Sequence, residues 1–291
     1  MHRSWQKREK TMDKTWEQFR RKKEFLVCVD SDGCAMNSMD VKHIRCFGPC
    51  MVEEWGLDRW KAPILERWNE INLYRMTRGI NRFKGLAKAL REIDAKYEKI
   101  EGIGDLERWV EQTRELSNTA LSGAIQERNS ICLKKALSWS EKVNKRIHDL
   151  PSELGRPFEG VKEALCRARD MADVAVVSSA NPQALDEEWN RYGVMEYVDV
   201  LLAQDMGSKT HCIKELLKKG YESSHALMIG DALGDYEAAE KNGIFFYPIL
   251  VRNEEHSWEE CRKTALNRLY QENYGGNYQD QVLKEFRKNL E

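Results

Sequence analysis

The chain has 291 residues, a formal net charge of −1 and 33% charged residues. This length can bury a large core and favours two domains. The balanced charge gives no signal for a nucleic-acid or membrane-surface partner, and no apolar stretch approaches the roughly 18 residues of a membrane span. Residues 1–23 are basic but contain acidic residues and no apolar segment, so we expect neither a secretory signal nor a transit peptide.

Eight cysteines are scattered along the chain without paired spacing. This usage is typical of reduced, mostly buried thiols and predicts a cytoplasmic protein. Cys46 and Cys50 are close in sequence, but they lack the second pair that would complete a zinc site. No pattern specifies an oligomeric state.

An apolar run at residues 25–29 leads into Asp30-Ser31-Asp32-Gly33. Side chains two apart on a strand share a face, so the carboxylates of Asp30 and Asp32 should repel each other. A chain tolerates this where a cation lies between the carboxylates or where one of them attacks a substrate. Gly33 lets the backbone turn sharply beside a bound group. The structural alternative is a solvated turn that merely ends a strand.

The next hundred residues show helical periodicity and no strand character. They predict an all-helical block over residues 38–154, inserted after the first strand. The expected helices are residues 41–55, 64–74, 83–100, 106–116 and 120–147, the last with breaks. The tryptophans lie mostly at helical core positions.

The pattern then alternates between strands and helices. Expected strands are residues 172–177, 198–202, 225–229 and 244–247, and expected helices are residues 158–171, 181–192, 209–219 and 236–242. This alternation predicts an α/β fold with a doubly wound, Rossmann-like parallel sheet. The first strand belongs to that sheet by character, so the core should comprise residues 1–37 and 155–291. Residues 257–290 predict two more helices around Gly275-Gly276.

Polar residues follow the predicted strands, and strand ends of such sheets converge on one site. They are Asp30, Asp32, Ser178, Ser179, Lys209, Asp231 and Asp235. Four carboxylates require a hard cation, most simply Mg²⁺, and a hydroxyl with an ammonium group would bind an anion. An anion beside Mg²⁺ indicates phosphate. One carboxylate can attack phosphorus, the lysine can neutralise the phosphoryl oxygens, and a second acid can transfer protons.

This order of motifs resembles the haloacid dehalogenase-like (HAD) hydrolase superfamily over residues 25–38 and about 155–250. The resemblance implies a phosphatase with a helical cap between the first and second motifs, at the position of the helical block. Cys34 stands where Thr or Val is commonest; the position lies in a turn, and this departure from the family pattern puts no catalytic role in doubt. The implied roles are Asp30 as nucleophile, Asp32 as general acid/base, Ser178 and Lys209 on the phosphoryl group, and Asp30, Asp231, Asp235 and the carbonyl of Asp32 on Mg²⁺.

The segment 71–91 contains six cations and no acidic residue. Arg78 and Arg82 are therefore candidate substrate contacts beyond the scissile phosphate, as are Ser179 and Asn181 after the second motif. The alternative for the arginines is a solvated basic helix face.

We therefore predict a Mg²⁺-dependent phosphatase, a phosphoric monoester hydrolase, acting on a small phosphorylated metabolite through an aspartyl-phosphate. Alternatives are a phosphomutase resembling β-phosphoglucomutase, a phospho-aspartate signalling module resembling a response-regulator receiver, and a catalytically inactive binding protein. Receivers carry their paired acids on a different strand and lack so large an insertion. A dehalogenase is disfavoured because Asp32 would have no obvious function in it. A phosphonatase would need a Schiff-base lysine in the helical block, and no lysine there stands out for that role.

Overall fold

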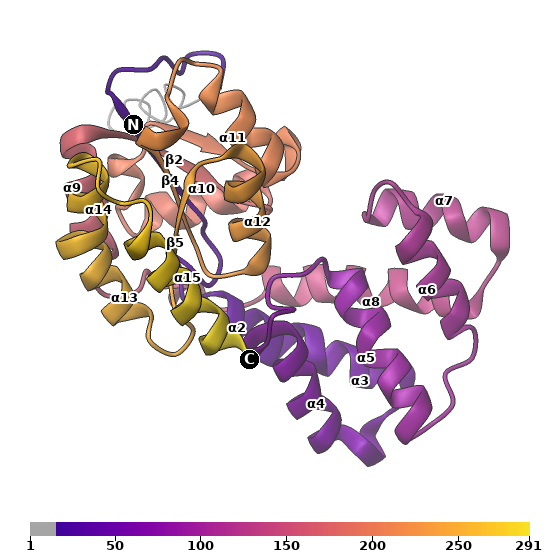
Figure 1. Cartoon of the computed structure of the whole chain (residues 1–291). Helices are drawn as coiled ribbons and strands as arrows, with labels where there is room; N and C mark the ends of the chain where they lie inside the picture. The colour runs from indigo at the N-terminus through magenta and orange to yellow at the C-terminus, as the bar shows by residue number, and fades with distance from the viewer. Residues whose placement is uncertain (1–15) are drawn as a thin grey trace, which may run out of the picture. The chain divides into compact units, whose positions relative to one another are not determined.

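The computed structural model describes residues 16–291. Most of the stretch on which the leader-peptide expectation rests, residues 1–15, lies outside the described residues. The described chain forms two compact units, one of residues 16–38 and Gly155–Glu291 and the other of Met39–Leu154 (Figure 1). Within the described part, no helix combines the length and apolar character needed to cross a membrane.

The first unit is built on a parallel sheet with the strand order β3-β2-β1-β4-β5. Its strands are short, apolar and buried on both faces, as parallel strands between two helical layers must be. The α/β, doubly wound fold expected from the sequence is thereby confirmed. The strands are β1 (Phe25–Val29), β2 (Ala172–Val177), β3 (Val200–Leu202), β4 (Ala226–Gly230) and β5 (Phe245–Pro248).

The register aligns the carboxyl ends of the central strands. Val29 of β1 pairs with Val176 of β2 and Ile229 of β4. The residues that follow these three strands therefore leave the sheet at the same edge, which is where parallel sheets bind ligands.

Helices of the first unit connect the strands and cover the sheet. They are α9 (Val161–Met171), α10 (Pro182–Arg191), α11 (Lys209–Leu217) and α12 (Leu233–Asn242), with 3₁₀ turns at Met195–Tyr197, Gln204–Met206 and Ser223–His225. Apolar residues of α9 and α10 share one buried cluster with alternate residues of the strands. Helix α12 begins three residues before the predicted start, which puts Asp235 in its first turn.

The C-terminal segment packs on the same core. Its helices are α13 (Glu254–Glu260), a π-helical turn (Cys261–Ala265), α14 (Leu266–Tyr270) and α15 (Asn277–Leu290). Trp258 and Leu266 belong to the cluster that also contains strand residues, and Figure 1 shows α13 and α14 beside α9. The segment is thus part of the fold of this unit.

The second unit is all-helical and has its own apolar core, in which Trp68 and Trp139 are fully buried. The helical stretch predicted over residues 120–147 with breaks forms two helices, and Asn129 adopts a left-handed φ of 46° between α7 and α8. The helices are α2 (Met39–Lys42), α3 (Gly48–Trp55), α4 (Lys61–Asn69), α5 (Arg82–Lys96), α6 (Ile103–Gln112), α7 (Asn118–Arg128) and α8 (Ile131–His148), with π-helical turns at His43–Phe47 and Glu70–Tyr74 and 3₁₀ turns at Asp58–Trp60 and Ser152–Leu154.

Candidate active site

The loop after β1 turns back on itself immediately beyond Asp30. The carbonyl of Ser31 accepts hydrogen bonds from the amides of Cys34 and Met36, at 3.2 and 2.8 Å. Gly33 has a φ of 83°, in the left-handed region that glycine enters without steric cost. The loop therefore places Asp30 at the carboxyl end of β1, and Asp32 lies within the turn that follows.

The loop after β4 carries Asp231 and Asp235. Asp235 lies in the first turn of α12, where its Oδ2 accepts a hydrogen bond from the amide of Ala232 at 3.1 Å. This contact satisfies a backbone donor that the start of a helix leaves unpaired. A Cβ on Gly230 would lie 2.4–2.6 Å from atoms of the Asp235 side chain. Glycine at this position is therefore what allows Asp235 to approach the strand end.

Three carboxylates converge at this edge of the sheet. One oxygen each from Asp30, Asp231 and Asp235 lies within 4.8 Å of the others. The residues are only 5%, 1% and 0% exposed. Three buried carboxylates repel one another unless cations compensate them. The donor set consists of oxygens alone, and it fits a hard divalent cation such as Mg²⁺.

Lys209 supplies one positive charge to this cluster from the first turn of α11. Its Nζ lies 2.7 Å from Asp30 Oδ1 and 2.6 Å from Asp235 Oδ1. Burial by itself would lower the pKa of Lys209, but the two carboxylates outweigh it and the net pKa is raised. Lys209 is therefore held as an ammonium ion between two acids from different strand ends.

The surroundings favour the charged form of Lys209 but disfavour the charged form of Asp30. Burial raises the pKa of Asp30 well above its ordinary range, Lys209 opposes the rise, and Asp235 and Asp231 add to it. One ammonium group thus does not compensate three carboxylates. A further cation among these oxygens would favour the ionised form of Asp30.

The side chain of Asp32 has a contact of its own. Its Oδ1 accepts a hydrogen bond from the hydroxyl of Ser38, and its carboxylate is not among the converging oxygens. Three of the four predicted carboxylates thus form the converging cluster, and the role of the Asp32 carboxylate beside them stays a prediction.

The second predicted motif follows β2. Ser178 is buried, and its Oγ accepts a hydrogen bond from the amide of Ala180 at 3.2 Å, which leaves the hydroxyl proton for donation to an anion. Ser179 is exposed. Asn181 is the N-cap of α10, with its Oδ1 accepting from the amides of Gln183 and Ala184 at 3.1 and 3.2 Å. The Oδ1 of Asn181 thus caps the N-terminus of α10.

The two predicted arginines of the helical unit have partners inside that unit. Arg78 is 1% exposed, and its Nη1 donates to the carbonyl of Leu73 at 2.8 Å. Arg82 Nη1 donates to Asn144 Oδ1 at 2.6 Å, and its guanidinium lies 5.1 Å from the ring centroid of Phe47. Neither side chain forms the solvated basic face considered as an alternative.

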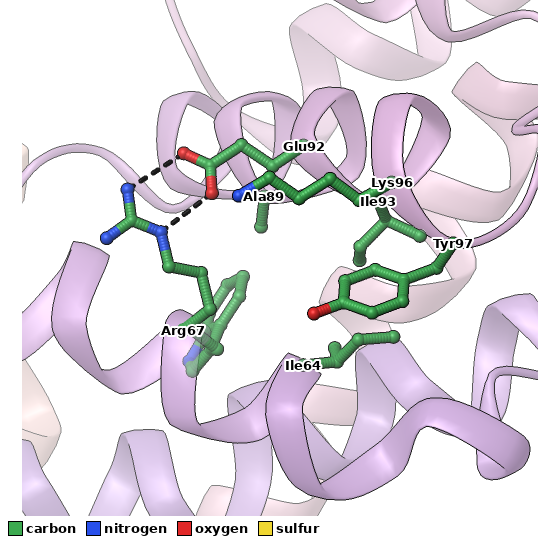
Figure 2. A pocket seen from close by; sticks show the side chains of 8 residues that line it. Ile64, Arg67, Ala89, Glu92, Ile93, Lys96 and Tyr97 are labelled. Atoms are coloured by element: carbon green, nitrogen blue, oxygen red, sulfur yellow. Dashed lines mark hydrogen bonds and ion pairs between the residues drawn. The ribbon is translucent and has the colours of Figure 1, made fainter.

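A pocket of about 90 Å³ lies between α4 and α5 of the helical unit (Figure 2). Its lining is mostly apolar, and Arg67 at its rim makes a two-pronged contact with Glu92 at 2.7 and 2.9 Å. That guanidinium is therefore already paired with a carboxylate. The pocket contains none of the residues of the acidic cluster, and it is smaller than the roughly 150 Å³ cavity that holds benzene in an engineered protein.

Two tryptophans without a predicted role at the site contact the loop of residues 30–36 that follows β1, called the acidic loop below. Trp189 Nε1 donates to Ser31 Oγ at 2.9 Å, and Trp258 Nε1 donates to the carbonyl of Cys34 at 2.9 Å. Both indoles lie at helical core positions, and nothing in their spacing separates them from ordinary core tryptophans. Only the fold shows which chain segment their N–H groups contact.

The fold and the site define a doubly wound α/β protein with an acidic, lysine-bridged cluster at the strand ends. The profile of the family described as haloacid dehalogenase-like hydrolase matches residues 80–249, more than half of the chain. The chain belongs to this hydrolase family, as its motifs predict. The matched range includes Lys209, Asp231 and Asp235, and the structure brings Asp30 against them from outside that range.

Two solved structures illustrate the similarity of this chain to known proteins at low sequence identity. A haloacid dehalogenase-like family hydrolase from Streptococcus pneumoniae is 12% identical, with a TM-score of 0.49 and coverage of 81% of this chain and 90% of that one. The HAD-hydrolase YfnB from Bacillus subtilis, solved bound to magnesium, is 12% identical, with a TM-score of 0.45 and coverage of 77% and 86%. A search of curated protein sequences found no match.

Proposed function

We propose that this hydrolase is a Mg²⁺-dependent phosphatase that cleaves a small phosphorylated metabolite through an aspartyl-phosphate. The observation that carries the proposal is the position of Lys209 between Asp30 and Asp235, with Asp231 completing a buried acidic cluster. A carboxylate, an ammonium group and an oxygen-rich cation site in one place are what phosphoryl transfer requires.

The cation site would be formed by Asp30, Asp231 and Asp235, together with the backbone carbonyl of Asp32. When bound there, Mg²⁺ supplies positive charge that neutralises phosphoryl oxygens. Lys209 would contribute a second positive charge, and the hydroxyl of Ser178 would donate to a phosphoryl oxygen.

The first chemical step is attack on phosphorus by one oxygen of Asp30. A bond forms between that oxygen and phosphorus, and the bond from phosphorus to the ester oxygen breaks. Asp32 gives a proton to the departing alkoxide. In the second step Asp32 takes a proton from water, which attacks phosphorus and releases inorganic phosphate and free Asp30. The contact of Ser38 with Asp32 would hold that acid during both proton transfers.

The helical unit, residues 38–154 in the sequence-based division, would act as the cap of this core. We propose that it selects the substrate beyond its phosphate and that Ser179, Asn181, Arg78 and Arg82 take part. Because Arg78 and Arg82 contact other residues of the helical unit, they would act on substrate selection by fixing the segments that they bind.

The eight cysteines form no disulfide, which supports the cytoplasm as the location of the protein.

The test is hydrolysis of a generic aryl phosphate by the purified protein with and without Mg²⁺. We expect release of inorganic phosphate that EDTA abolishes and that Asp30→Asn reduces by about 10³-fold or more, as loss of a nucleophile does. Turnover unaffected by Asp30→Asn would contradict the proposal. With a panel of phosphorylated metabolites, a product that keeps its phosphoryl group would instead support the phosphomutase alternative.

A further inference from the structure

Two buried tryptophans contact the acidic loop on either side of Asp32-Gly33. Trp189 comes from α10 and donates its indole N–H to Ser31 Oγ at 2.9 Å. Trp258 comes from α13 and donates to the carbonyl of Cys34 at 2.9 Å. Both tryptophans are 0% exposed. A buried indole N–H needs an acceptor, and each of these finds it in the same short loop.

The contact from Trp258 continues through the loop to the end of β4. Cys34 Sγ lies 3.6 Å from the carbonyl oxygen of Ile229, to which it donates. The same carbonyl accepts the amide of Asp30 at 3.0 Å. Trp258 is therefore joined through Cys34 and Ile229 to the backbone of Asp30, and the next residues along from Ile229 are Gly230 and Asp231.

The position of Trp258 is itself closely packed. Gly160, at the start of α9, has a φ of 87°, and a Cβ there would lie 3.2 Å from Trp258 Cβ. The chain at Trp258 thus lies close to the start of α9, and its indole N–H contacts the loop that follows β1. This arrangement links the C-terminal helices directly to the residues of the candidate active site.

We propose that Trp189 and Trp258 are positioning residues, which hold the loop at Ser31 and Cys34 and thereby orient Asp30 and the carbonyl of Asp32 toward the cation site. The inference deepens the proposed function and rests on it. A loop held at both ends loses less freedom when metal and substrate bind, and catalytic groups need placement to within about 0.5 Å. Helix α13 would then support catalysis by holding the loop that carries Asp30.

The test compares Trp258→Phe and Trp189→Phe with the control Tyr274→Phe. Tyr274 is also fully buried, in the same unit, and donates its hydroxyl to a backbone carbonyl, that of Phe246, at 2.9 Å. All three variants lose one buried donor and place a phenyl ring at the substituted position, but the acceptor in the control lies on β5. The tryptophan variants also lose buried volume, and Tm reports that loss. The measurements are Tm, kcat and KM with an aryl phosphate, and Mg²⁺ affinity by calorimetry.

We expect each tryptophan variant to lower kcat and to weaken Mg²⁺ binding by about 10-fold, as loss of a group behind a metal ligand does. KM should change by less than about 3-fold, and Tyr274→Phe should leave both kcat and Mg²⁺ affinity within about 2-fold. Tryptophan variants that match Tyr274→Phe in every measurement would overturn the inference. If no phosphate ester is cleaved by the unmodified protein while the tryptophan variants alone bind Mg²⁺ more weakly, the phosphatase proposal fails and the positioning role stands.

A second variant covers the case in which a tryptophan variant does not fold. Ser31→Ala removes the acceptor of Trp189 without changing either indole. We expect Ser31→Ala to lower kcat and Mg²⁺ affinity as Trp189→Phe does. The variant that carries both changes should lose no more kcat or Mg²⁺ affinity than the more impaired of the two single variants, because both changes remove the same hydrogen bond. Additive losses in Ser31→Ala and Trp189→Phe would contradict the inference.

Discussion

Asp30 and Lys209 form a buried ion pair, with Asp30 Oδ1 2.7 Å from Lys209 Nζ. The two residues are far apart in sequence and come from the end of β1 and the start of α11. The same ammonium group also contacts Asp235. Lys209 therefore serves two purposes in the proposed enzyme, because it reduces repulsion among the acids and is the charge available to a phosphoryl group.

Replacing Lys209 should affect both stability and activity. Lys209→Gln leaves three buried carboxylates without their ammonium partner, so we expect Tm to fall in EDTA and to recover in excess Mg²⁺. Activity should fall by about 10²-fold or more, because a charge opposite the transition-state oxygens is lost. Lys218→Gln, at the exposed end of α11, is the control. A Tm loss that Mg²⁺ does not reduce would argue against charge repulsion as the cause.

Asp30→Asn should separate catalysis from folding. The variant should be inactive, yet its Tm in EDTA should equal or exceed that of the unmodified protein. Burial raises the pKa of Asp30, so the ionised form is disfavoured in the fold, and a neutral amide avoids that cost. Thermal unfolding with and without Mg²⁺ tests this, with exposed Asp58 replaced by Asn as the control. A large Tm loss in Asp30→Asn would show that its charge supports the fold.

Gly230→Ala should displace Asp235. The new Cβ would lie 2.4–2.6 Å from atoms of that side chain, closer than packing allows. We expect Mg²⁺ affinity to fall by about 10- to 100-fold, the range found when support of a metal ligand is lost. Gly234→Ala is the matched control, because a Cβ there meets nothing within 4 Å. Calorimetric titration that gives equal Mg²⁺ affinities for both variants would contradict the steric explanation.

The ion pair of Arg67 and Glu92 should make the helical unit sensitive to acid. The hydrogen bond from Arg67 lowers the pKa of Glu92, so its stabilisation is present above the unfolded-state pKa and is lost as pH falls through the folded one. The pair is partly exposed, and it should contribute only about 0.5 kcal/mol. Urea unfolding of Glu92→Gln should therefore show a small loss at pH 7 that disappears near pH 3. The same difference at both pH values would exclude the ion pair as its source.

Bound Mg²⁺ should stabilise the first unit. A ligand at 100 times its dissociation constant stabilises a fold by about 2.7 kcal/mol, so Tm should rise with Mg²⁺ concentration. Asp231→Asn should reduce that rise, whereas Asp199→Asn, outside the acidic cluster, should not. A Tm that does not depend on Mg²⁺ in the unmodified protein would contradict the proposed cation site.

The strand ends show which parts of the site can be predicted from local sequence pattern. Residues 25–29, 172–177 and 225–229 are short apolar runs between turn residues, and that pattern suffices to place Asp30, Ser178 and Asp231 at one edge of a sheet. The pattern also predicts the helical character of the second unit, with breaks in residues 120–147. It does not give the position of the break at Asn129, because periodicity does not reveal a left-handed backbone conformation.

The sequence by itself determined the doubly wound fold and the acidic and basic residues of the strand ends, because hydrophobic periodicity and motif order are local properties. Only the tertiary structure decided which side chains meet. It joins Asp32 to Ser38, places Lys209 between Asp30 and Asp235, and brings Trp189 and Trp258 onto the loop that follows β1. These contacts join residues up to 224 positions apart, and such pairings depend on how helices pack on the sheet.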